Sequence, residues 1–452
     1  MTLPVRHGVC DRLVRCRATE RYPLGRRARL ELDGIAVKRH EEVVTLSITC
    51  GIDWAEAHHD VALIDEHGVV VARSRIDTGA AGFSALLALI AEHGGGVDDT
   101  PVAVETDKNL IVVALVEAGF TVYPINPRGV ARYRERYGQA GGKSDPGDAT
   151  VLAHILRTDR HLHRQLPTNT NQAGAIKVLA RQDQEAIWAL HQTVSRLRAV
   201  LLEFYPQALQ AFPNLQHHAA TTVLAAVPTP AAAGKLTRTR VATLLRRSGR
   251  GNQAALAERI LTELRVPSLR QPSCVEEAYG HTVQGLVGAV EAMRTAADAL
   301  EKALACEFDQ HPQSDLLRSV PGLGPVLAAR VLAEIGDDPA RFDNPQSLRA
   351  YAGTAPVTIA SGRSRYVKAR KVRNKRLADA CHWWAFTTLT KSGGARAHYD
   401  RRRAAGDHHN AALRNLANKL IGRLWWCLAN NQPWDEDDAW PNIARTEKAT
   451  AA

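Results

Sequence analysis

Hydrophobic and polar positions between residues 46 and 166 alternate in the manner of short strands and helices. Three strand patterns in hairpin order come first, and strand and helix patterns then take turns along the chain. This order predicts an α/β domain in which helices cover the faces of a mixed sheet. The strands are expected at 45–53, 58–68, 69–77, 101–105 and 120–126, and the helices at 80–95, 109–119, 128–138 and 146–159.

Two longer stretches, 171–205 and 281–308, carry apolar residues at alternating spacings of three and four. This spacing predicts coiled-coil helices, which pair either with each other or with helices of another protomer. We therefore expect a helical hairpin over 167–310, with a proline-rich insertion of short helices at 206–280. The seam positions are Leu190, Val194, Leu197 and Leu201 in the first helix and Val283, Leu286, Val290 and Leu304 in the second.

The third unit, 311–430, is expected to be mainly helical. Its stretch 315–336 reads as a helix, a glycine-rich turn and a second helix, and further helical patterns follow a basic loop. The ends of the chain show no apolar periodicity, so 1–45 is expected to be a basic disordered arm and 431–452 a frayed polar tail. The predicted fold class is thus α/β plus all-α.

Composition narrows the function classes. A chain of 452 residues is too long for one ordinary core, and its net charge of +11 favours a polyanionic partner. The seven cysteines are scattered without a CxxC pair, so we expect neither a disulfide framework nor a zinc knuckle, and a reducing cytoplasm fits best. No apolar run reaches the roughly 18 residues of a membrane helix, and the first residues do not resemble a signal peptide.

Four carboxylates stand where strands end and a helix begins. Asp53 ends the first strand, Glu105 ends a later one, and Asp145 and Asp148 share a face at the start of a helix. Acids gathered at one sheet edge repel each other unless cations neutralise them, and such oxygen ligands suit Mg²⁺ or Mn²⁺. Taken singly, Asp145 and Asp148 could instead be a helix cap and a first-turn acid, and Glu105 a surface residue.

A serine precedes a dense run of cations in the third unit. Ser361 and Gly362 are followed within sixteen residues by eight arginines and lysines. Clustered cations can hold a phosphate and stabilise charge at phosphorus, so Ser361 is a candidate nucleophile, with Ser364 as a near competitor. The alternative is a solvated basic loop. The candidate phosphate contacts are Arg363, Arg365, Lys368, Arg370, Lys371 and Arg373.

The glycine turn at 321–336 is a further candidate contact to DNA. A tight turn before a helix exposes backbone N–H groups, so Gly322 and Gly324 are candidate phosphate contacts. A plain helix connector is the alternative. The adjacent histidines, such as His58 and His59, have poor metal-ligand spacing and are expected in solvent or at caps. The paired tryptophans at 383–384 and 425–426 are expected in the core.

Several of these motifs together resemble one known family. GIDWA, VETD, YPINP and KSDPGDA, followed by SVPGLGPVLAARVLAEIGD and YAGTAPVTIASGRSR, are similar to the insertion-sequence "one-ten" family of transposases. The resemblance covers about 46–430 apart from the insertion. It implies a RuvC-like, RNase H-like DEDD domain at 46–166 and a C-terminal transposase domain with a helix-hairpin-helix-like element. Where the family often has a glycine and an aromatic, this chain has Asp107, Lys108 and Asn109, and Asp60 is a weaker competitor for the metal.

The resemblance also implies a mechanism. Asp53, Glu105, Asp145 and Asp148 would bind Mg²⁺ or Mn²⁺ beside the serine of another protomer, and Ser361 would form a phosphoserine link to double-stranded DNA. A structured guide RNA from the element would choose the sequence, and a dimer or tetramer would act in the bacterial cytoplasm at the nucleoid. Two rivals remain: a Holliday-junction-type nuclease that uses only the acids, and an inactive DNA-binding remnant.

Overall fold

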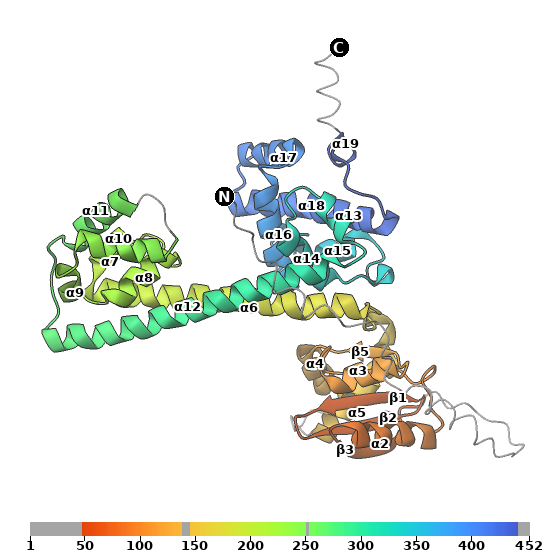
Figure 1. Cartoon of the computed structure of the whole chain (residues 1–452). Helices are drawn as coiled ribbons and strands as arrows, with labels where there is room; N and C mark the ends of the chain where they lie inside the picture. Colours follow the sequence, from red (N-terminus) through yellow and green to blue (C-terminus); the bar gives the residue numbers. More distant parts are fainter. Residues whose placement is uncertain (1–47, 138–144, 250–252, 442–452) are drawn as a thin grey trace, which may run out of the picture. The chain divides into compact units, whose positions relative to one another are not determined.

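The computed structural model describes residues 48–137, 145–249 and 253–441 (Figure 1). The chain divides into two compact units, one ending at Leu166 and the other beginning at Pro167. The basic arm expected at 1–45 lies outside the described residues, as does the end of the chain from 442. Among the described helices, none is both long and apolar enough to cross a membrane.

The first unit contains a five-stranded mixed sheet, as predicted. Its strand order is β3-β2-β1-β4-β5, in which the first three strands along the chain pair antiparallel and β4 and β5 continue the sheet in parallel. Cys50 and Ile52 of β1 and all three residues of β4 have no exposed surface, so the centre of the sheet is buried. The strands are β1 (Thr49–Trp54), β2 (His58–Ile64), β3 (Val70–Asp77), β4 (Val102–Val104) and β5 (Val122–Pro124).

Helices cover both faces of this sheet. One face packs through Ile52 against Leu86 of α2 (Ala80–Glu92) and Leu115 of α3 (Leu110–Glu117). On the other face lie α4 (Pro127–Tyr137) and α5 (Asp145–Asp159). The 3₁₀ turn η2 (Arg160–Leu162) follows α5.

Helix α5 rests directly on β1. A Cβ atom added to Gly51 would lie 2.5 Å from the amide nitrogen of Ala153 and closer still to the carbonyl oxygen of Ala149. Only glycine therefore permits this approach, and α5 is held at a fixed depth over the strand that carries Asp53.

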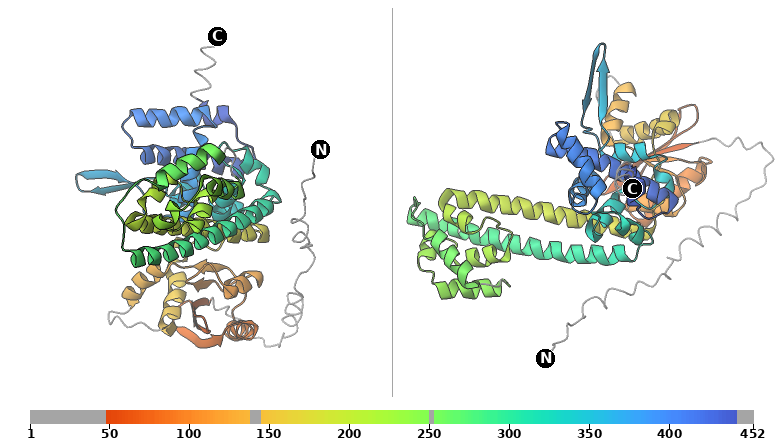
Figure 2. Two further views of the ribbon diagram at one scale, coloured as in Figure 1. Left: turned by 60° about the vertical axis from the view of Figure 1, so that its left-hand side comes forward. Right: turned by 90° about the horizontal axis from the view of Figure 1, so that it is seen from above.

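The second unit contains the helical hairpin that the apolar spacing predicts. Helix α6 (Asn171–Phe204) packs along α12 (Ser273–Asp309) within the same chain, which decides between the two pairings expected. The pair is antiparallel, because Leu197 shares a core cluster with Val283 and Ile176 shares another with Leu304 (Figures 1 and 2). The inserted helices are α7 (Pro206–Ala211), α8 (His218–Ala226), α9 (Pro230–Gly234), α10 (Arg238–Arg247) and α11 (Gln253–Leu264).

A second core joins the base of this hairpin to the C-terminal helices. Fully buried Trp384 of α16 belongs to it. The tail was expected to be frayed from residue 432, and this is wrong for its described part, because Trp440 is only 6% exposed in the same core. The elements are α13 (Ser314–Ser319), α14 (Pro325–Ile335), η3 (Pro339–Arg341), α15 (Pro345–Ala352), β6 (Val357–Ser361), β7 (Ser364–Lys368), α16 (Lys375–Thr388), α17 (Gly393–Ala404), α18 (His409–Asn430) and α19 (Glu436–Ala439).

Buried ion pairs tie α6 to α14. Asp183, with no exposed surface, accepts hydrogen bonds of 2.6 and 3.0 Å from Arg330. One turn away, Arg181 donates bonds of 2.8 and 2.9 Å to Glu334. Burial alone would raise the pKa of Glu334, but these bonds and the Arg181 charge outweigh it and lower that pKa. The contacts fix the long helices against the C-terminal helices.

Candidate active site

Strand register aligns three carboxylates at one level of the first sheet. Asp53 of β1 pairs with Asp60 of β2, and Ile52 pairs with Val104, so that Glu105, directly after β4, continues the same register. Side chains alternate along a strand, so Asp53 shares the face of Gly51, which is the face that α5 covers. The register therefore puts Asp53, Asp60 and Glu105 on the α5 side of the sheet.

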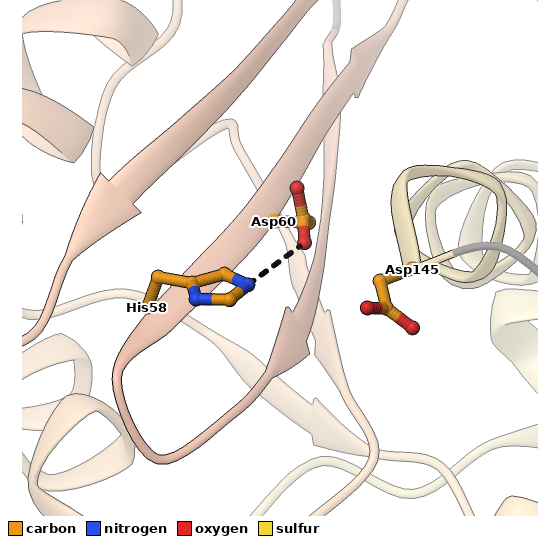
Figure 3. Close-up of side chains that lie close together, drawn as sticks. All are labelled: His58, Asp60 and Asp145. Atoms are coloured by element: carbon orange, nitrogen blue, oxygen red, sulfur yellow. Dashed lines mark ion pairs between the residues drawn. The ribbon is translucent and has the colours of Figure 1, made fainter.

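Asp145, the first residue of α5, lies at the same end of that face. One ligand atom each from His58, Asp60 and Asp145 lie within 4.8 Å of one another, the arrangement drawn in Figure 3. Asp60 was expected to be a weaker competitor and His58 a solvent or capping residue, so the interpretation of His58 is corrected here. The β1–β2 hairpin itself was the signal, because it puts Asp60 directly opposite Asp53.

Two arginines balance this negative charge. Arg75 of β3 donates hydrogen bonds of 3.2 and 3.0 Å to the two oxygens of Asp60, and these bonds together with the charge of Asp145 raise the pKa of the Arg75 guanidinium. Asp148 is buried and accepts a bond of 2.7 Å from Arg134 of α4. Asp148 thus faces α4, and it is not among the three residues whose ligand atoms gather beside Asp60.

Two histidines at the start of β2, His58 and His59, lie beside these acids. The Nε2 atom of His58 lies 3.7 Å from Asp60 Oδ2, and this buried atom has no hydrogen-bond partner among the described residues. His59 is buried, and burial together with the neighbouring His58 lowers its pKa, which favours a neutral ring.

The donor set fits a divalent cation. Carboxylate oxygens suit Mg²⁺ and Mn²⁺, while imidazole nitrogen suits softer transition metals. Two carboxylates and an imidazole nitrogen within 4.8 Å of one another are thus a donor set that can hold a divalent cation.

Ser361 lies at the tip of a β-hairpin, not in the loop that the sequence suggested. It ends β6 and pairs directly with Ser364, the first residue of β7, so that only Gly362 and Arg363 form the turn. Gly362 has a φ of +54°, which suits the first central position of a two-residue hairpin turn. Both serines are exposed, and Figure 2 shows the hairpin projecting from the helices of the second unit.

Only two of the six predicted phosphate contacts, Arg363 and Arg365, lie at this tip, because Lys368 pairs with Val357 at the other end of the hairpin and the remaining three follow β7. Lys368 lies over the ring of Tyr366, 4.7 Å from its centroid, and Arg373 packs over Gly353 at the end of α15. Arg370 is half-buried. The remaining members of the set are exposed: Arg363, Arg365 and Lys371.

The glycine turn divides its two candidates between different environments. Gly322 packs against α16, since an added Cβ would lie 2.8 Å from the amide nitrogen of Thr388. Gly324 is exposed at the N-terminus of α14, where no side chain caps the helix. Close packing therefore accounts for Gly322, and only Gly324 stands open to a phosphate.

Comparison with known proteins gives one consistent result. A DEDD-type domain model from IS110, described as a transposase, matches residues 50–206, and the model described as "Transposase IS116/IS110/IS902 family" matches 314–400. The chain is 47% identical over 401 residues to the "Mini-circle putative transposase for IS117" of Streptomyces coelicolor, covering 87% of this chain and 97% of that protein. Similar too are an IS110 protein of the same organism (31% identity, 63% and 70% covered) and an IS900 protein of Mycobacterium paratuberculosis (27%, 85% and 96%).

Proposed function

Because the chain belongs to the IS116/IS110/IS902 family of insertion-sequence transposases, we propose that it exchanges DNA strands through Ser361 and a divalent-cation site in its first unit. The observation that carries the cation site is the register that aligns Asp53, Asp60 and Glu105 on the face where Asp145 begins α5.

The first unit is proposed to have an RNase H-like fold. Its support is the strand order β3-β2-β1-β4-β5, with three antiparallel strands extended by two parallel ones. Acids at strand ends next to a helix N-terminus are what phosphoryl-transfer sites with bound cations require.

The cation ligands are proposed to be Asp53, Glu105 and Asp145, joined by Asp60. Mg²⁺ or Mn²⁺ bound there would stabilise charge that develops on the phosphate oxygens. Asp148, although expected among the ligands, is held by Arg134 and would have to leave that ion pair to take part.

The chemistry is proposed to begin at the hairpin tip. The Ser361 hydroxyl loses its proton to solvent and its Oγ bonds to a DNA phosphorus, while the bond from phosphorus to one sugar oxygen breaks and that oxygen takes up a proton. A hydroxyl of a second DNA end then attacks the same phosphorus, and the P–Oγ bond breaks to restore Ser361. Exposed Arg363 and Arg365 are placed to bind the flanking phosphates.

The remaining partners are proposed on the family resemblance. They are a guide RNA that selects the target by base pairing, and a dimer or tetramer that brings two duplexes together. The exposed cations at the hairpin are compatible with either DNA or RNA backbones.

Trapping the covalent adduct tests the proposal. The full-length protein is incubated with DNA of the element ends, denatured and resolved for a protein–DNA band. Ser361→Ala is expected to reduce adduct formation and strand exchange by several orders of magnitude, because the nucleophile is removed. DNA binding should remain, because the cations are unchanged.

Ser364→Ala is the matched control, since Ser364 lies opposite Ser361 on the same hairpin with the same exposure. Ser364→Ala should reduce adduct formation and strand exchange much less than Ser361→Ala does. If Ser361→Ala still formed recombinants, the serine would not be the nucleophile, and a nuclease that uses the acids and a water molecule would be the better interpretation. If only Ser364→Ala lost the adduct, the nucleophile would be Ser364.

A further inference from the structure

A row of aromatic rings lies on the surface of the C-terminal helices, outside the site described above. Trp383 and Phe386 of α16 are each 48% exposed, although the sequence suggested that Trp383 lies in the core. The row, called here the aromatic row, consists of His382, Trp383, Phe386, Tyr399 and His409.

The rings contact each other edge to face. Centroid distances are 6.2 Å between Trp383 and Phe386 and 6.4 Å between Phe386 and His409, with interplanar angles near a right angle (89° and 88°). His409 continues the row to Tyr399 of α17, whose hydroxyl lies 2.7 Å from His409 Nδ1. Edge-to-face contacts of this kind are favourable and fix the rings relative to one another, while Trp383 and Phe386 keep about half of their surface accessible to a flat ligand.

Buried neighbours hold the row in place. Trp384, next to Trp383, is fully buried, and its Nε1 donates a bond of 2.9 Å to the carbonyl of Pro321. A helix turn later, the hydroxyl of Thr387 donates to the carbonyl of Gly322. The exposed rings therefore stand on a helix that cannot rotate to bury them, so their exposure is a fixed property of the fold.

One helix that contributes to the aromatic row is rich in arginine. Helix α17, which supplies Tyr399, carries four arginines and one aspartate. Asp400 pairs with Arg396 at 2.8 Å and Asp407 with Arg402 at 2.7 Å, while Arg401 and Arg403 remain exposed. Helix α17 thus carries more positive than negative charge.

We propose that the aromatic row binds unpaired bases of DNA, with the arginines of α17 holding the adjoining phosphates. Ring faces stack on any base, but paired bases in a duplex hide their faces, so this surface selects an opened strand. A second copy of this chain fits less well, because the chain carries a net charge of +11 and α17 itself has four arginines against one aspartate. The inference rests on the proposed strand exchange, during which a strand must leave its duplex.

Binding of labelled oligothymidine of about 12 nucleotides, measured by fluorescence anisotropy on the full chain, tests this. Trp383→Ala and Phe386→Ala should each weaken binding about tenfold, while duplex DNA binding stays within about twofold. Trp383→Phe should restore most of the loss, because a ring face returns. Trp426→Ala is the control: Trp426 is 37% exposed and lies beneath Arg423, but it is not part of the row.

Three outcomes would overturn the inference. Unchanged oligothymidine binding in both alanine variants would exclude stacking. If the alanine variants lost more affinity for oligouridine than for oligothymidine, the occupant of the row would be RNA. If the alanine variants changed the sedimentation coefficient of the protein without DNA, the row would be a protein interface. Ser361→Ala separates this proposal from the serine mechanism, because it should bind oligothymidine as the wild type does. If the covalent adduct still formed in Ser361→Ala, the serine mechanism would be refuted, and the proposal for the aromatic row would be unaffected.

Discussion

Gly51→Ala is a small substitution that should disturb the candidate site by displacing α5, which packs on Gly51. The new methyl group points from β1 into α5, where the amide nitrogen of Ala153 lies 2.5 Å from the Cβ position. Ordinary contacts begin at 3.4 Å, so α5 must retreat by about 1 Å. Asp145 begins that helix and would move with it.

The magnitude follows from packing and geometry. Overpacking of this kind costs about 1–3 kcal/mol, which for a small domain lowers the melting temperature by roughly 4–12 °C. A displacement of about 1 Å at a reacting site reduces the rate about 100-fold. We therefore expect Gly51→Ala to remain folded but to lose most of its strand exchange.

The assay combines thermal unfolding with adduct formation on DNA of the element ends. Gly129→Ala is the matched control, because Gly129 lies in α4 of the same unit and the nearest atom to its added Cβ is 3.9 Å away. That control should be neutral or slightly stabilising, since alanine favours helices. Wild-type melting and adduct yield in Gly51→Ala would refute the close approach of α5 to β1.

Three further changes have defined outcomes. Asp145→Asn should abolish strand exchange but leave the fold intact, and Mn²⁺ should raise its melting temperature less than that of the wild type; full recombination would exclude a metal cluster there. Leu197→Glu places a charge at a position with no exposed surface and should destabilise the helical hairpin, whereas unchanged thermal stability would refute the seam. Arg330→Met leaves the carboxylate of Asp183 buried without its cation and should reduce the free energy of unfolding by about 3–5 kcal/mol in denaturant titrations, a loss that adding Asp183→Leu should largely reverse.

Local patterns were sufficient for most helices and strands. The strand 69–77 and the helix 171–205 were expected within one residue of β3 and α6, because strand alternation and three-four spacing are read from neighbouring residues. The second long helix begins at Ser273, eight residues before its expected start at 281. There the seam spacing is lost, and the helix is held instead by Glu276, whose carboxylate pairs with Arg270.

What the sequence missed depends on pairing across the chain. The Ser361 hairpin was visible in principle, since VTIAS and SRYVK flank a glycine-containing two-residue turn, but the density of cations suggested a loop. The partnership of Asp148 with Arg134 joins two helices and leaves no local pattern. Exposure of Trp383 beside buried Trp384 likewise follows from which face of α16 meets the core, and both residues belong to the same apolar run.

The length of the two long helices sets the distance of the inserted helices from the base of the hairpin. At 1.5 Å per residue, the 34 residues of α6 span about 51 Å, and the inserted helices α7 to α11 are attached at the far end of that length. Removing seven residues from α6 and seven from α12 would keep every seam residue in phase and draw the inserted helices inward by about 10 Å. Removing four would turn them about the hairpin axis. The reach of this arm can therefore change without a change in its direction only when the residues removed from each helix make close to a whole number of turns, as seven do.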